Sequence, residues 1–120
     1  MMNTRVQKIE AALDVVFPGE YALFIEKTGY CEIHGLEIYG YLETMIHPDR
    51  IPCVIGATKR HRMEGLAHRF IVLSHTGFED RVILLDTESG EVFEDGMEGW
   101  IAISHSFNTW REKLRDEVPP

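Results

Sequence analysis

The chain has 120 residues and a formal net charge of −8, with hydrophobic residues at 44% and charged residues at 27%. This length is typical of one globular domain, and the composition is that of a protein with an ordinary apolar core. No apolar stretch approaches the roughly 20 residues that cross a bilayer, and the first residues lack the apolar segment of a signal peptide. We therefore expect one domain over residues 1–120, located in the cytoplasm and without membrane contact.

The acidic residues are concentrated in one stretch, residues 77–100, where Arg81 is the only basic residue. Such a surface repels phosphate backbones, so direct binding of nucleic acid is disfavoured and a basic protein partner is favoured. An acidic face that only keeps the protein soluble is the simpler alternative. The acidic residues of this stretch are Glu79, Asp80, Asp86, Glu88, Glu91, Glu94, Asp95 and Glu98.

Two short helices are predicted at the N-terminus. Apolar residues recur at helical spacing in the first segment and indicate an amphipathic helix. Pro18 interrupts this pattern and suits the first turn of a second helix, which carries Tyr21, Phe24 and Ile25 on one face. Gly29 is the natural C-terminal cap of the second helix, so the two form a helical hairpin. The apolar residues of the first helix are Val6, Ile9, Leu13 and Val16.

The middle of the chain favours short strands and turns. Residues 33–39 are interrupted by a glycine, which indicates either a strand with a bulge or a tight hairpin. Residues 48–52 lie between two prolines and predict a loop. Residues 54–55 are consistent with a short strand, and Thr58 suits the cap of a helical turn that ends at Gly65.

Three strands are predicted in the second half of the chain. Residues 70–73 and 82–85 are continuous apolar runs, and residues 91–93 form a shorter one. The loop at residues 86–90 contains Asp, Ser and Gly, which is typical of a hairpin whose Gly90 has a positive φ.

A last helix is predicted after Ser106, which suits its N-cap. Phe107, Trp110 and Leu114 lie on one face of this helix, and core packing is the expected role of Trp110. With helices at both ends, the sequence predicts an α+β fold. In this fold an N-terminal helical hairpin and a C-terminal helix pack on a mostly antiparallel sheet.

Neither a metal site nor a disulfide is expected. His61, His68 and His75 are seven residues apart, but the predicted elements place them on a helix, a loop and a strand end. Zinc sites usually have one close pair of ligands on a single element. Cys31 and Cys53 lie among apolar neighbours and are best interpreted as buried free thiols.

Catalytic motifs are also missing from the sequence. The serines occur in no G-x-S-x-G turn, and residues 86–90 lack the spacing of an EF-hand calcium loop. The glycines are scattered and form no phosphate-binding loop. The sequence therefore predicts that the protein is not an enzyme and needs no cofactor.

Five segments resemble, in the same order, those of the SUKH superfamily, and they are distributed over nearly the whole chain. Residues 13–21 resemble the family's LGVxLPxxY helix junction, and residues 28–40 its Gly…I.G.EIYG strand. Residues 55–66 are similar to its T…R…GLP segment. Residues 85–92 closely match its LDTxxGxV hairpin, and residues 103–110 resemble its last helix, IADSFEEWL. The chain departs from the pattern elsewhere, with an alanine after Gly-Leu in place of the family's proline.

The SUKH superfamily includes fungal cell-wall synthesis regulators and many bacterial immunity proteins. The resemblance therefore implies an α+β fold and a protein-binding function. Our leading hypothesis is an immunity protein that binds and neutralises a cognate nuclease-type toxin, since an acidic face fits a basic, nucleic-acid-cleaving partner. The alternative is a regulatory or scaffolding module of the same fold with another protein partner.

Trp100 follows the acidic and glycine-rich residues 94–99. Core packing is one interpretation, but an aromatic residue beside carboxylates also suits the centre of a protein interface. We expect the partner to contact the acidic stretch, with Trp100 or Phe78 as an anchor. The predicted partner-binding residues are Phe78, Glu79, Asp80, Glu94, Asp95, Glu98 and Trp100.

Overall fold

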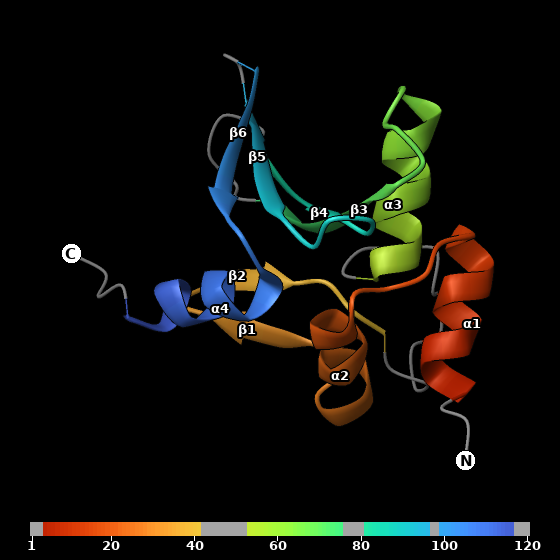
Figure 1. The fold of residues 1–120 in the computed structure, drawn as a ribbon, viewed down its shortest axis with the longest axis horizontal. Helices are drawn as coiled ribbons and strands as arrows, with labels where there is room; N and C mark the ends of the chain where they lie inside the picture. Colours follow the sequence, from red (N-terminus) through yellow and green to blue (C-terminus); the bar gives the residue numbers. More distant parts are fainter. Residues whose placement is uncertain (1–3, 42–52, 76–80, 97–98, 117–120) are drawn as a thin grey trace.

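The computed structural model describes residues 4–41, 53–75, 81–96 and 99–116 (Figure 1). The strands form two antiparallel sheets, a hairpin β1-β2 and a meander in the order β3-β4-β5-β6. The expected α+β class is therefore confirmed. No described helix is both long and apolar enough to cross a membrane. The elements are α1 (Thr4–Leu13), α2 (Gly19–Lys27), β1 (Cys31–Ile33), β2 (Leu36–Ile38), α3 (Val54–Met63), β3 (Phe70–His75), β4 (Val82–Asp86), β5 (Val92–Gly96), β6 (Gly99–Ser104) and α4 (Phe107–Asp116).

The N-terminal helical hairpin forms as predicted, although α1 is shorter than its apolar pattern suggests. It ends at Leu13 because Asp14 adopts a left-handed conformation, with φ of 55°. The chain then turns, and the carboxylate of Glu10 accepts a hydrogen bond of 2.7 Å from the backbone N–H of Phe17. Val16 is consequently 78% exposed and does not belong to the buried face of α1.

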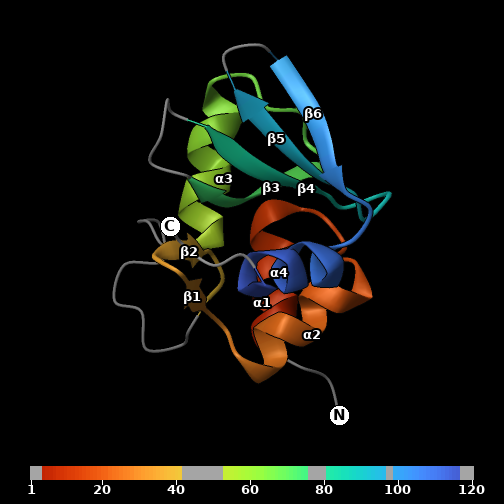
Figure 2. The same cartoon turned by 90° about the vertical axis from the view of Figure 1, so that its left-hand side faces the viewer.

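An aromatic cluster joins α2 to α4, which lie side by side in Figure 2. The ring of Tyr21 meets Phe17 and Phe107 edge-on, at centroid distances of 4.9 and 5.0 Å. Phe107 and Trp110 are both buried, as predicted. The N-terminus of α4 is capped as expected, because the Ser106 hydroxyl accepts a hydrogen bond from the N–H of Thr109.

Residues 31–38 form the tight hairpin rather than the bulged strand. His34 and Gly35 have φ of 50° and 84°, and positive φ at both central residues is the requirement of a type I′ turn. After β2 the chain runs along β3, where the N–H of Tyr39 donates to the carbonyl of Leu73 at 2.7 Å. This contact attaches the small hairpin to the larger sheet.

The strand expected at residues 54–55 is wrong, and so is the helix cap expected at Thr58. Both segments belong to α3, which begins after Cys53. Residues 53–58 are buried on every side, and a short apolar run of this kind does not distinguish a buried helix from a strand. The Thr58 hydroxyl accepts a hydrogen bond from the N–H of Val72, which fixes α3 against β3. The loop predicted at residues 48–52 lies outside the described residues.

The larger sheet contains the three predicted strands and a fourth, β6, that was not predicted. Every residue of β4 is buried, whereas the first four residues of β6 are exposed. Gly90, in the β4–β5 turn, has φ of 84° as expected. In the sheet order β6 is the terminal strand, and no other described strand pairs with its outer side.

Candidate partner-binding surface

One face of the larger sheet carries two of the predicted binding residues. Asp95 lies directly opposite Trp100 in the β5–β6 register, and Phe93 lies opposite Ala102. Directly paired residues share a face of a sheet, as do residues two apart along a strand. Asp95, Trp100 and Phe93 therefore share one face. We call this face, together with Phe70 of β3, the aromatic face.

Trp100 is held in place by two other rings. Its ring lies 4.6 Å from that of Phe70 with an interplanar angle of 82°, and 6.1 Å from that of Phe93. Phe70 and Phe93 also meet edge-on at 5.9 Å. Each such contact is worth about 0.5–1.5 kcal/mol beyond area burial. The indole is thus fixed by its neighbours while its side chain remains 44% exposed.

Glu94 lies on the opposite face from Asp95, because successive strand residues alternate. Its carboxylate accepts a hydrogen bond of 3.2 Å from the Arg81 guanidinium. This contact joins the start of β4 to β5 across the hairpin. The predicted partner-binding residues therefore do not all share one face of the sheet, since Asp95 lies beside Trp100 and Glu94 does not. Among the described residues, no ion pair or side-chain hydrogen bond involves Asp95.

Four of the predicted binding residues cannot be placed on either face. They lie in the segments between β3 and β4 and between β5 and β6, outside the described residues. These four are Phe78, Glu79, Asp80 and Glu98.

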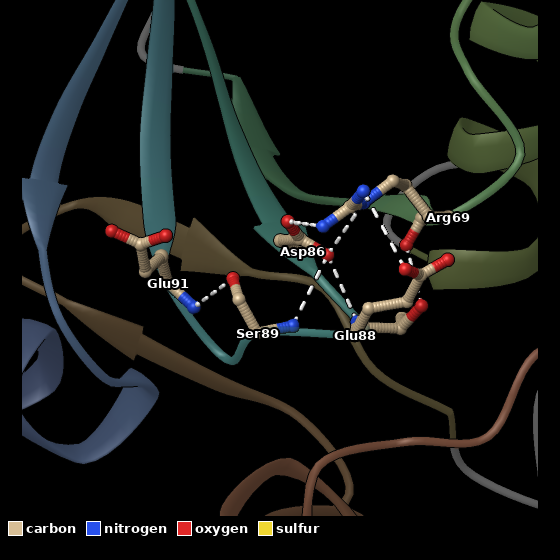
Figure 3. A network of polar contacts seen from close by, with 6 residues as sticks. Arg69, Asp86, Glu88, Ser89 and Glu91 are labelled. Atoms are coloured by element: carbon tan, nitrogen blue, oxygen red, sulfur yellow. Dashed lines mark hydrogen bonds and ion pairs between the residues drawn. The ribbon is translucent and has the colours of Figure 1, made fainter.

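A polar network connects the residue before β3 to the β4–β5 turn (Figure 3). The Arg69 guanidinium donates two hydrogen bonds to the Asp86 carboxylate, at 2.9 and 2.6 Å. The same carboxylate accepts from the backbone N–H groups of Glu88 and Ser89. Burial alone would raise the pKa of Asp86, but these hydrogen bonds outweigh it and hold the pKa below its ordinary value.

This network was not predicted from the sequence. Arg69 and Asp86 are 17 residues apart, and no local pattern connects them. The guanidinium carbon of Arg69 also lies 5.8 Å from the centre of the Phe70 ring. Arg69 therefore links the aromatic face to the β4–β5 turn. One signal was available in the sequence. If the predicted strands 70–73 and 82–85 pair as an antiparallel hairpin without a bulge, then Arg69 and Asp86 lie next to each other at its end.

A cavity of about 390 Å³ lies on the other face of β5 and β6, between the sheet and α4. Its wall is mostly apolar, with one carboxylate and one ammonium group. The Lys113 ammonium donates a hydrogen bond of 3.1 Å to the carbonyl of Ile103. The residues that line the cavity are Leu36, Ile83, Glu94, Ile103, Trp110, Lys113 and Leu114.

Two of the three evenly spaced histidines meet in space. His61 lies on α3, His68 in the following turn and His75 at the end of β3, as predicted. The Nε2 atoms of His61 and His75 are 2.8 Å apart, and the Tyr39 hydroxyl lies 2.7 Å from Nδ1 of His75. Burial lowers the pKa of His75, and His61 and Arg60 lower it further. No group of three or more potential metal ligands occurs within the parts of the chain that are described.

The two cysteines differ in burial. Cys53 is fully buried, in agreement with the expectation, whereas Cys31 is only partly buried. Burial raises the pKa of the Cys31 thiol, and the nearby Arg111 and Arg115 oppose this effect only in part. A raised pKa disfavours the thiolate, which is the reactive form.

Fold and surface together define an α+β domain whose larger sheet has helices packed against both faces and ends in a strand with exposed apolar residues. Residues 2–113 match the SUKH_5 family, described as SMI1-KNR4 cell-wall, and the chain therefore belongs to this family. The resemblance seen in the sequence is confirmed. No curated protein matches the chain closely enough to count as a relative.

The segments that carry the family resemblance build the scaffold. Tyr21 and Phe107 are in the aromatic core, and Asp86 organises the β4–β5 turn. Arg62 donates to the carbonyls of Leu13 and His68, so it joins the ends of α1 and α3. None of these residues lies on the exposed part of β6. Family membership thus accounts for the fold, and the partner must be inferred from the exposed surface.

Proposed function

We propose that this chain is an immunity-type protein that neutralises a basic, nuclease-type toxin by binding it directly. One observation carries the proposal. The exposed indole of Trp100 is held by two phenyl rings beside the carboxylate of Asp95. Fixed aromatic side chains that are ringed by polar groups are the usual energetic centres of protein interfaces.

The charge of the chain supports the choice of partner. A nuclease must hold a phosphate backbone and therefore presents a basic surface. A chain with a net charge of −8 is attracted to such a surface, and electrostatic attraction mainly accelerates association. An indole inserted between partner side chains would then slow dissociation. A protein bound at that surface also excludes the nucleic acid from it.

The test begins with affinity capture from the native source, followed by co-expression of the captured protein with this chain. We expect the captured protein to be basic and toxic when expressed alone, and harmless when this chain is present. Trp100→Ala should abolish protection. Leu23→Ala is the matched control, because Leu23 is 48% exposed on α2, well separated in sequence and fold from β6.

Charge is tested with Asp95→Lys rather than with Glu94, because Glu94 pairs with Arg81 and its reversal would disturb the hairpin. We expect Asp95→Lys to slow association about tenfold at low salt, with a smaller effect at high salt. A captured partner that is not toxic would overturn the immunity function. That outcome would favour a regulatory module, to which the cell-wall description of the family also points.

A further inference from the structure

We propose that β6 receives an extended basic segment of the partner as an additional strand, so that the four-stranded sheet continues into the partner. This inference rests on the proposed function and specifies how the partner is held. Strand addition at an open sheet edge derives affinity from backbone hydrogen bonds and specificity from alternate side chains.

The edge is unprotected over residues 99–102, because the bulge of β6 lies beyond them, at Ile103. β6 is the terminal strand of the sheet (Figure 1), and among the described residues no strand pairs with its outer side. Natural proteins usually block such edges with charged residues, proline or a bulge. The sequence of β6, Gly-Trp-Ile-Ala-Ile-Ser, contains neither charge nor proline. Alternate residues of this strand turn their N–H and C=O groups outward and can pair with a further strand.

The usable part of the edge is limited to residues 99–102. The register shifts between Val92 and Phe93 of β5, which leaves Ile103 as the bulged residue of β6. The Ile103 carbonyl is already occupied by the ammonium of Lys113. Four extended residues span about 13 Å, which is enough for a short added strand.

The two faces of β6 select different side chains in the added strand. On the aromatic face, the Trp100 ring and the Asp95 carboxylate are directly opposed. Lys or Arg can contact both, through a cation–π interaction and an ion pair. On the other face Ile101 is 59% exposed, opposite Glu94 and two residues before Ile103 of the cavity wall. The best occupant is therefore a strand in which basic and apolar residues alternate.

A second copy of this chain fits the edge less well. Each copy carries a net charge of −8, so edge-to-edge pairing brings like charges together. β6 also supplies no cation to the Trp100 of another copy. Both arguments favour a basic partner over self-association.

The probe for this inference is a synthetic peptide of about eight residues that alternates Lys and Val, acetylated and amidated at its ends. Two further peptides have the same sequence but carry backbone N-methyl groups. One is methylated at its odd-numbered residues and the other at its even-numbered residues. In an added strand only alternate N–H groups face β6. We therefore expect one methylated peptide to lose affinity about tenfold or more while the other binds like the parent.

Binding is followed by amide chemical shifts and hydrogen exchange of the isotope-labelled protein. The amides of residues 99–102 should shift and become protected as the peptide is added up to about 1 mM. Trp100→Ala should weaken peptide binding about tenfold, whereas Leu23→Ala should leave it unchanged. Replacing Lys by Glu in the peptide should abolish binding, because Asp95 would then face a like charge.

Three results would overturn the proposal: no perturbation of residues 99–102 at about 1 mM peptide, equal affinity of the two methylated peptides, or a dimer of the free protein that pairs through β6. The outcome is separable from the proposed function. A failed peptide experiment with intact protection from the toxin rejects strand addition alone. Clear strand addition without protection rejects the immunity function alone.

Discussion

β4 and β6 belong to the same sheet and have comparably apolar sequences, yet they differ in burial and in the number of strands that pair with them. All five residues of β4 are buried, and the first four residues of β6 are exposed. β4 lies between two neighbouring strands and contributes to the common core, whereas β6 pairs with only one of the described strands. The difference shows that apolar residues in this sheet have two roles. Those in β4 belong to the core, whereas in β6 only Ile103 packs against the core and Trp100, Ile101 and Ala102 are exposed.

The largest expected effect separates the two tryptophans. Trp110 is buried on α4 against Phe107, so Trp110→Ala should lower the free energy of unfolding by about 3–5 kcal/mol. Trp100→Ala removes two ring contacts, one edge-on and one tilted, and should cost about 1–3 kcal/mol. Urea unfolding of both variants measures the contrast. Equal losses would mean that β6 contributes to the core as much as α4 does.

An intermediate effect is expected at Asp86, where the buried strand passes into its turn. Asp86→Ala leaves Arg69 and two backbone N–H groups without their acceptor and should cost about 2–3 kcal/mol. The pKa of Asp86 is lower in the folded state, so the unfolded chain binds a proton more readily as the pH falls. The stability that Asp86 provides is therefore present above about pH 4 and is lost at lower pH.

Asp86→Asn isolates this pH dependence, because asparagine keeps the shape and does not titrate. Between pH 7 and pH 3 the wild-type protein should lose more stability than the variant. Thermal unfolding across this range provides the measurement. Parallel pH profiles for the two proteins would show that Arg69 does not hold the carboxylate as the geometry indicates.

The comparison of β4 and β6 also explains which parts of the fold could be predicted. β4 was predicted because a continuous apolar run between turn residues is typical of a central strand. β6 was missed because its apolar residues follow Gly96 and Gly99, which favour a loop, and because its exposed residues do not alternate. The aromatic and β-branched residues at positions 100–103 were the available signal.

The candidate surface could be predicted only in part. The sequence showed that Asp95 and Trp100 belong to one acidic stretch. It did not show that they face each other while Glu94 turns away, since that depends on the register of β5 and β6. The meeting of Phe70 with Trp100 depends on contacts across four strands. Such contacts between distant positions leave no periodic pattern in a single sequence.

The smallest expected effect on stability is the sharpest test of the comparison. Ile101 is 59% exposed on β6, so Ile101→Lys should change the free energy of unfolding by no more than about 0.5 kcal/mol. A lysine on an edge strand nevertheless blocks the approach of another strand, and its charge repels a basic partner. We therefore expect a protein that folds normally and no longer binds its partner. The equivalent change in β4, Leu84→Lys, buries a charge in the core and should prevent folding. If Ile101→Lys unfolds the protein as Leu84→Lys does, then β6 is part of the core, and its exposed residues are not kept for a partner.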